Sequence, residues 1–114
     1  MKSAEKLSKA DIRKELDRLK QGVQERSLPP ESFKDPTLTL SNFGKFAGRY
    51  ANPIVVPPQA AILGVGRIKQ EPVVDENEIK ISRVLPLALT FDHRAITGGE
   101  ATRFLGTVIA HLEG

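Results

Sequence analysis

His93 is the residue of this sequence best placed for acid–base chemistry. It stands in the stretch TFDHRAITGGEAT, residues 90–102, between an apolar β-type run and the start of a helix. Sheet proteins expose side chains to ligands at such junctions, and an imidazole accepts a proton near neutral pH. The alternative is a strand-end histidine that only satisfies a hydrogen bond, and its position alone leaves both interpretations open.

The residues that most other kinds of functional site require are absent from this sequence or wrongly spaced in it. The chain has no cysteine, which excludes a disulfide framework, a cysteine-ligated metal and a thiol nucleophile. The two histidines, His93 and His111, lie in different predicted elements, so no metal site is expected. His111 is near the end of the last helix, where the helix dipole accounts for it. Gly64 and Gly66 follow a β-type run, but the third glycine of a dinucleotide-binding loop would fall at Lys69.

The composition is that of an ordinary globular domain, with 39% hydrophobic and 27% charged residues in a chain of 114. The net charge is +3, but basic and acidic residues are interleaved in KADIRKELDRLKQ, which is typical of a solvated helix face. With one tyrosine and no tryptophan, nucleic-acid binding is not expected. No apolar run approaches the length of a membrane span and the N-terminus has no apolar signal core, so a cytoplasmic protein without membrane contact is expected.

Two helices are predicted from their capping chemistry and apolar periodicity. Ser8 stands three residues before Asp11, as in a capping box, and the helix should end near residues 24–26 because two prolines follow. Thr97 and Glu100 form a second capping box that starts the last helix. Each helix carries a single apolar stripe, which means that each packs on something else.

The segment between the helices reads as β structure. TLTLSNF alternates like a strand covered on one face, and IVVPPQ is interrupted by two prolines, as in an edge or a crossing segment. AAILGVGRIKQ and EIKISRVLPLALTF are the strongest β runs, with a hairpin tip at residues 75–77 and Pro86 at a bulge or edge. The sum predicts an α/β sandwich with helices on a sheet.

Two of these stretches together resemble a known family. TLTLSNFGKFAGRYANPIVVPPQAAILGVGRI, followed by VLPLALTFDHRAITGGEATRFL, is similar to the C-terminal half of the catalytic domain of dihydrolipoamide acyltransferases, the E2 components of 2-oxoacid dehydrogenase complexes. LSKADIRKELDRL with LPPESF resembles the preceding helix, so essentially the whole chain is covered. The resemblance implies part of the chloramphenicol acetyltransferase fold, a two-layer α/β sandwich whose mixed sheet, with a long antiparallel hairpin, is covered by helices.

The family implies a mechanism for two residues. His93 matches the histidine of the family's DHRxxDG motif, a general base that takes the proton from a thiol of coenzyme A or dihydrolipoamide, so that the sulfur attacks a thioester carbonyl. Ser41, in LTLSNFG, matches the serine whose hydroxyl donates to the tetrahedral oxyanion. The family's active site lies between subunits of a trimer, so Ser41 and His93 are expected to meet from different chains.

Thr97 departs from the family pattern, which has Asp at this position of the motif. Threonine is also a good N-cap, so the helix start survives the change. It supplies no carboxylate, however, so Thr97 is expected to support the geometry of the site and not to serve as an ionic partner of the base.

Residues 1–114 are expected to be a partial catalytic domain, without the N-terminal half, the lipoyl-bearing domain or the subunit-binding domain. Coenzyme A is the implied co-substrate, the lipoyl group would arrive on another domain, and no metal is implied. The implied partners are copies of the chain in a trimer or trimer-based core and other 2-oxoacid dehydrogenase components, in the cytoplasm or the mitochondrial matrix. A half-sheet exposes an edge and apolar faces, which also favours oligomerisation or a complementing partner.

Three functions remain after the sequence is considered. The leading hypothesis is an acyltransferase acting between dihydrolipoamide and coenzyme A. The second is a non-catalytic assembly module that retains the oligomeric acyltransferase fold. The third, ranked last, is a basic binding protein.

Overall fold

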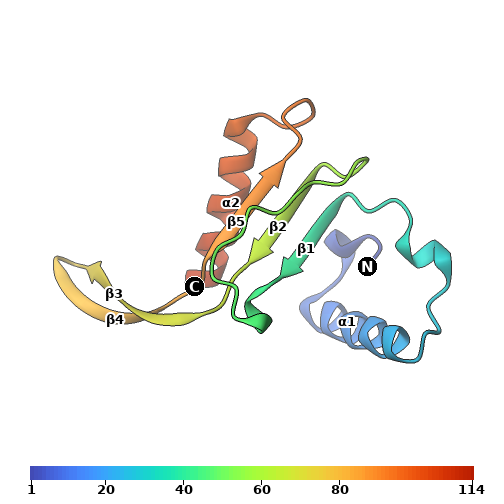
Figure 1. The fold of residues 1–114 in the computed structure, drawn as a ribbon, viewed down its shortest axis with the longest axis horizontal. Helices are drawn as coiled ribbons and strands as arrows, with labels where there is room; N and C mark the ends of the chain where they lie inside the picture. Colours follow the sequence, from blue (N-terminus) through green and yellow to red (C-terminus); the bar gives the residue numbers. More distant parts are fainter. The chain divides into compact units, whose positions relative to one another are not determined.

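The computed structural model describes every residue from Met1 to Gly114. The chain forms two units, Met1–Asp35 and Pro36–Gly114, and each is described separately. Figure 1 shows their elements in sequence colours.

The first unit is built around helix α1, Lys9–Gln24, with short 3-10 turns at Ala4–Lys6 and Pro30–Phe33. The Ser8 hydroxyl oxygen accepts the Asp11 N–H at 3.2 Å, and the hydroxyl donates to the Asp11 carboxylate at 2.6 Å. The predicted start and end of this helix are therefore confirmed. Its apolar stripe stays partly exposed, with Val23 60% exposed, so this unit by itself covers the stripe poorly.

The second unit contains a mixed three-stranded sheet made of β1 (Leu38–Asn42), β2 (Ala61–Val65) and β5 (Leu87–Phe91). The strand order is β1-β2-β5; β1 runs parallel to β2, and β5 runs antiparallel to it. The mixed sheet is thus confirmed, and β1 and β5 are its two edges.

A separate antiparallel hairpin consists of β3 (Lys69–Asp75) and β4 (Glu78–Val84). Glu76 and Asn77 form its tip, both with positive φ (48° and 65°), as a two-residue turn of type I′ requires. The predicted tip is confirmed, and Figure 1 shows the hairpin as an arm extending from the sheet.

The two long β runs that the sequence predicts are each broken in the structure. Residues 66–68 separate β2 from β3, and residues 85–86 separate β4 from β5. The Gly66 N–H donates to the Pro86 carbonyl at 2.9 Å across this junction. Because Pro86 has no N–H to continue a ladder, it marks the change from the sheet to the hairpin arm. Of the two expected positions, a bulge or an edge, Pro86 lies directly before the edge strand β5 and not at a bulge inside one long strand.

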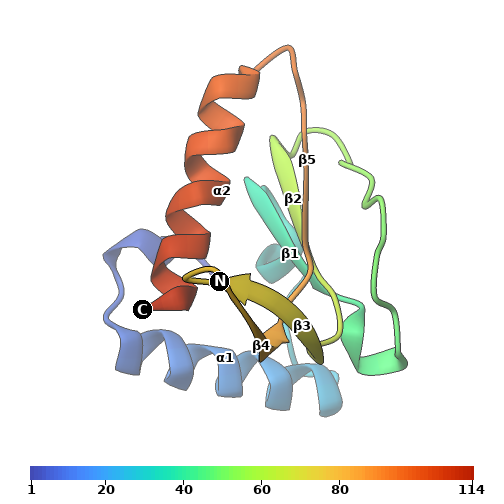
Figure 2. The same cartoon turned by 90° about the vertical axis from the view of Figure 1, so that its left-hand side faces the viewer.

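Helix α2 (Gly98–Glu113) covers one face of the sheet, and the segment 43–60 runs along the other face (Figure 2). Ala61, Leu63 and Ala101 are the buried apolar side chains between sheet and helix. On the opposite face, Gly64 lies against Phe43 and Pro53, which leaves little room for a side chain. The sheet is therefore layered on both sides, with a small core.

One face of the hairpin arm is apolar and is not covered within this unit. Val74 pairs with Ile79, and Pro72 pairs with Ile81, so the four side chains share one face of the arm. Val74, Ile79 and Ile81 are 76–79% exposed. Helix α2 lies on the sheet and not on the arm, and a two-stranded hairpin alone is marginally stable in water.

Candidate functional site

The turn that follows β5 presents His93 at one end of the sheet. Its first residue, Asp92, donates its N–H to the Ala60 carbonyl at 2.8 Å, which continues the pairing of β5 with the β2 side. The Asp92 carbonyl accepts the N–H groups of Ala95 and Ile96 at 3.0 and 2.9 Å. These three bonds close a tight turn with His93 on its outer, exposed side.

The Asp92 carboxylate adds side-chain hydrogen bonds to the same turn. Its Oδ1 accepts the N–H and the Nε–H of Arg94, both at 3.0 Å, and its Oδ2 accepts from Nη2 at 2.8 Å. The hydrogen bonds from the Arg94 side chain lower the pKa of Asp92 from its usual 3.8 to about 2. The same pair raises the pKa of Arg94.

The His93 imidazole is exposed and has no hydrogen bond within the chain. Its ring contacts that of Phe91, with centroids 5.5 Å apart and planes tilted by 40°. The ring is thus free to meet a ligand from outside the chain, and its place is set by the turn and by Phe91.

Thr97 occupies the N-cap of α2, as predicted. Its hydroxyl oxygen accepts the Glu100 N–H at 3.3 Å, while Glu100 Oε2 accepts the Thr97 N–H and hydroxyl, each at 2.8 Å. These bonds lower the pKa of Glu100. The Thr97 hydroxyl therefore serves the helix start beside His93, and it is not bonded to the imidazole.

Ser41 is the fourth residue of β1 and is half-buried. Side chains alternate along a strand, so Ser41 shares a face with Thr39, whose hydroxyl bonds to Gln59, while Leu40 points to the other face and is 67% exposed. Ser41 lies on an edge strand near its C-terminal end.

His93 and Thr97 lie in the same short connection between β5 and α2, whereas Ser41 lies at the other end of the sheet. Ser41 is in register with Gly64, and Gly64 with Ala88, at the end of the sheet where the hairpin arm begins. His93 follows Phe91 at the opposite end, roughly 15 Å away along the strands at about 3.3 Å per residue.

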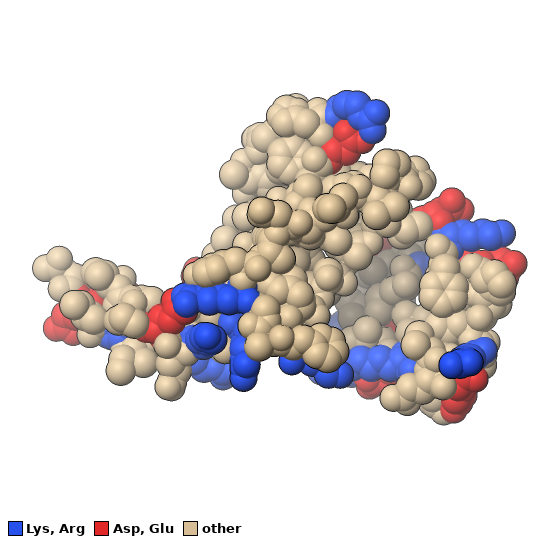
Figure 3. Space-filling view, in the orientation of Figure 1, with Lys and Arg blue, Asp and Glu red and all other residues tan.

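Two features of the site were not anticipated from the sequence. One is the Asp92–Arg94 ion pair. Its only signal in the sequence is that residues of opposite charge stand on either side of a histidine. Figure 3 shows a basic and an acidic group side by side at the β5–α2 connection. The other is an apolar hollow of about 350 Å³ between the sheet and α2, behind the turn. Its wall includes Leu38, Leu89, Phe91, Ile96, Phe104 and the single carboxylate of Glu100.

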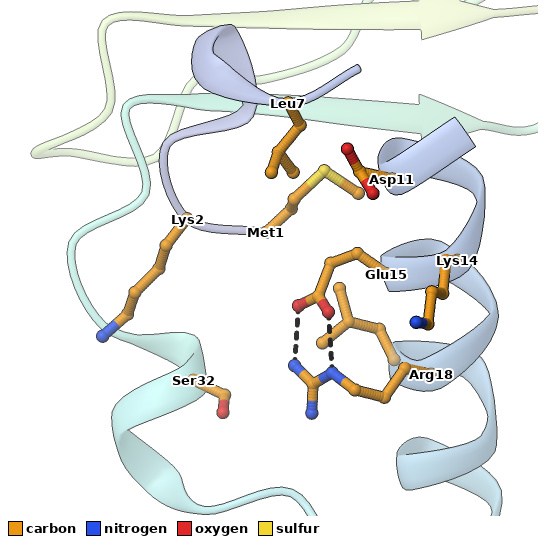
Figure 4. A pocket seen from close by; sticks show the side chains of 9 residues that line it. Met1, Lys2, Leu7, Asp11, Lys14, Glu15, Arg18 and Ser32 are labelled. Atoms are coloured by element: carbon orange, nitrogen blue, oxygen red, sulfur yellow. Dashed lines mark hydrogen bonds and ion pairs between the residues drawn. The ribbon is translucent and has the colours of Figure 1, made fainter. Parts of the chain in front are cut away.

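A second hollow, of about 490 Å³, lies in the first unit beside α1 (Figure 4). Arg18 donates to both oxygens of Glu15 on its wall, at 2.6 and 2.7 Å, and this lowers the pKa of Glu15. No histidine lines this hollow, and Arg18 and Glu15 on its wall form an ion pair with each other. We therefore do not assign the acid–base site to it.

No group of three or more metal-ligating side chains is gathered anywhere in the chain. None of the helices combines the length and the apolar character needed to cross a membrane.

The whole chain, residues 1–114, matches the family model described as 2-oxoacid dehydrogenases acyltransferase (catalytic domain). A relative from Saccharomyces cerevisiae, the mitochondrial dihydrolipoyllysine-residue succinyltransferase component of the 2-oxoglutarate dehydrogenase complex, is 40% identical over 99% of this chain and 24% of its own length. A relative from Staphylococcus epidermidis, the acetyltransferase component of a pyruvate dehydrogenase complex, is 40% identical over 86% of this chain and 23% of its own length. The chain therefore spans about a quarter of the length of these relatives.

Solved structures agree with this match. The cubic core of a pyruvate dehydrogenase multienzyme complex has a TM-score of 0.80 and 32% identity, covering 89% of this chain and 42% of that chain. The dihydrolipoamide acetyltransferase of Azotobacter vinelandii has a TM-score of 0.81 and 31% identity, covering 90% and 42%. Work on the catalytic mechanism of that enzyme addresses a serine, a histidine 52 positions later and an asparagine four positions after the histidine.

Proposed function

The chain belongs to the catalytic-domain family of the 2-oxoacid dehydrogenase acyltransferases, and on this premise we propose that it moves an acyl group between dihydrolipoamide and coenzyme A. The observation that carries the proposal is a shared spacing. Ser41, His93 and Thr97 are separated by 52 and by four positions, as are the serine, histidine and asparagine studied in the Azotobacter vinelandii enzyme. We assign residues 1–114 to the C-terminal half of the catalytic domain.

In the proposed reaction His93 is the general base. Its imidazole takes the proton from the attacking thiol, and the sulfur adds to the carbonyl carbon of the acyl thioester. The tetrahedral intermediate then collapses, the bond to the other sulfur breaks, and the imidazolium returns the proton to the departing thiolate. The exposure of His93 at a hydrogen-bonded turn supports this role, because the ring is open to a substrate that comes from outside the chain.

Ser41 is the proposed donor to the oxyanion that forms on the carbonyl oxygen. One preorganised donor of this kind is typically worth about 2.7–4 kcal/mol of transition-state stabilisation. Since Ser41 and His93 occupy opposite ends of the sheet, the proposal requires Ser41 of one copy to meet His93 of another. We propose a homotrimer, alone or as the unit of a larger core, which a relative with a cubic core also supports.

The other substrates and partners follow from the same premise. Coenzyme A is the co-substrate, the lipoyl group arrives on a separate domain, and the other components of a 2-oxoacid dehydrogenase complex are the partners. The proposed location is the cytoplasm or, in a eukaryotic cell, the mitochondrial matrix. Thr97 supports the site by fixing the start of α2 four residues after His93.

A second candidate function is an assembly module without turnover. The bare apolar face of the hairpin arm favours it, because this face calls for a protein partner whether or not the site is active. The two candidates share the fold and the oligomer, and they differ in the need for His93.

The deciding experiment is acyl transfer to dihydrolipoamide from acetyl-coenzyme A and from succinyl-coenzyme A. We expect His93→Ala to lower the rate about 10²- to 10⁴-fold, as the loss of a general base does. The matched control is His111→Ala. His111 is the other histidine of the chain, and its Nδ1 lies 2.8 Å from the Thr107 carbonyl oxygen, with which it forms a hydrogen bond. Equal rates for wild type and His93→Ala, or no transfer by either, would remove the catalytic proposal and leave the assembly module.

A further inference from the structure

We infer that the Asp92–Arg94 ion pair positions the imidazole of His93 by fixing the backbone on both sides of it. The positioning itself stands on the geometry of the turn, whereas its consequence for catalysis rests on the proposed function. Neither Asp92 nor Arg94 needs to touch a substrate in this role.

The first part of the argument is that Asp92 anchors the turn to both neighbouring elements. Its N–H reaches back to Ala60 at the start of β2, and its carbonyl accepts from Ala95 and Ile96 just before α2. His93 is therefore held between a sheet and a helix, and its Cα has little freedom as long as Asp92 keeps its place.

The second part is that the carboxylate binds the residue on the far side of His93. Oδ1 holds the Arg94 N–H, which fixes the peptide that follows His93, and the guanidinium spans both carboxylate oxygens. A planar guanidinium that grips a carboxylate at two points restricts orientation as well as distance. Arg94 is 84% exposed, and Asp92 is its one ion-pair partner.

The third part is that His93 has no anchor of its own. A histidine that acts as a base is commonly oriented by a hydrogen bond to its second ring nitrogen, and the His93 ring has none within the chain. The backbone of the turn and the contact with Phe91 must do this work. Because the pKa of Asp92 is about 2, its carboxylate stays ionised across the range of roughly pH 5 to 8 in which imidazoles commonly titrate.

Proton NMR of the two histidines tests the positioning without any assay of activity. Because the His93 and Phe91 ring centroids are 5.5 Å apart, we expect the His93 ring signals to carry a ring-current shift from Phe91. His111, near the other end of α2, is an internal control for the fold. We expect Asp92→Ala and Arg94→Ala each to move the His93 signals toward those of an unstructured histidine, with the His111 signals unchanged. Arg83→Ala is the matched control, since it removes an exposed arginine of the hairpin arm and should move neither.

Arg94→Ala keeps every main-chain bond of the turn and alters an exposed side chain, so it decides the question even if Asp92→Ala does not fold. His93 signals that stay at their wild-type positions in folded Arg94→Ala would overturn the inference. Arg94→Lys is the conservative variant, and we expect it to restore the signals only in part, because an ammonium does not span two oxygens.

The kinetic readout separates positioning from substrate binding. We expect Arg94→Ala to lower kcat about 10- to 100-fold, the scale of a misplacement near 1 Å, with KM changed less than about threefold. A kcat equal to that of wild type, in a variant whose His93 signals have moved, would overturn the catalytic consequence of the inference, while the moved signals would still support the positioning. If His93→Ala itself were as active as wild type, the proposed function would fall, while the NMR result would still report on the turn.

Discussion

Ser41, on the edge strand β1, and His93, in the turn that follows the other edge strand β5, lie at opposite ends of one three-stranded sheet. No side-chain rotation brings a serine hydroxyl and an imidazole together over roughly 15 Å. If both take part in one reaction, as we propose, then the reaction centre forms between copies of the chain. Assembly is then a condition of activity.

Gly66 should be intolerant of any side chain because the backbone meets it there. A Cβ at this position would lie against the Arg49 carbonyl oxygen, and 3.3 Å from the Phe43 ring. We expect Gly66→Ala to lower the free energy of unfolding by about 1–3 kcal/mol, as overpacking does. Denaturant unfolding measures the change.

The control for this prediction is Gly106→Ala in the interior of α2, where a Cβ would meet nothing within 4 Å. There, alanine should raise the free energy of unfolding by about 0.5–1 kcal/mol, because glycine disfavours the helix. Equal effects of the two substitutions would show that the contact between the 43–60 segment and the sheet is not as described.

Asp92 should make the folded chain sensitive to acid. Its pKa is depressed to about 2 when folded, below the usual 3.8, so its ionised form stabilises the fold above about pH 4. This contribution is lost as the pH falls through about 2. We expect Asp92→Asn to lower the free energy of unfolding near neutral pH and to approach wild type as the pH falls below about 2; a difference independent of pH would contradict this.

Thr97 should act through the helix start. Thr97→Ala removes the acceptor for the Glu100 N–H and should lower the free energy of unfolding by about 1 kcal/mol. Thr97→Asn keeps a good N-cap and supplies the residue type studied in the Azotobacter vinelandii enzyme, so it should keep both stability and acyl transfer. Loss of transfer in a stable Thr97→Asn variant would mean that the hydroxyl itself is needed.

Local chemistry in the sequence predicted local structure well. Both helix starts were predicted because Ser8 and Thr97 satisfy N–H groups only three residues away. The hairpin tip was predicted because residues 75–77 suit a tight turn. The broken β runs were missed, since the effect of Pro86 depends on a bond from Gly66 that lies 20 residues earlier in the chain.

The candidate site was predictable in part. His93 and Thr97 share one short connection, and their neighbourhood follows from the strand–turn–helix pattern. The distance between Ser41 and His93 follows from the register of the strands, and local sequence patterns do not determine this register. The apolar hollow behind the turn joins residues from β1, β2, β5 and α2, so it appears only once the sheet and helix are packed.

The most direct test of the account is complementation between two inactive variants, Ser41→Ala and His93→Ala. Each homo-oligomer lacks one of the two groups at every site, so each alone should be inactive. When the two variants are dissociated, mixed in equal amounts and reassembled, about a quarter of the sites in a cyclic oligomer should combine an intact Ser41 with an intact His93 from a neighbour. The account predicts acyl transfer at about that fraction of the wild-type rate; a reassembled mixture that stays inactive, beside wild type that regains its activity after the same treatment, would contradict it.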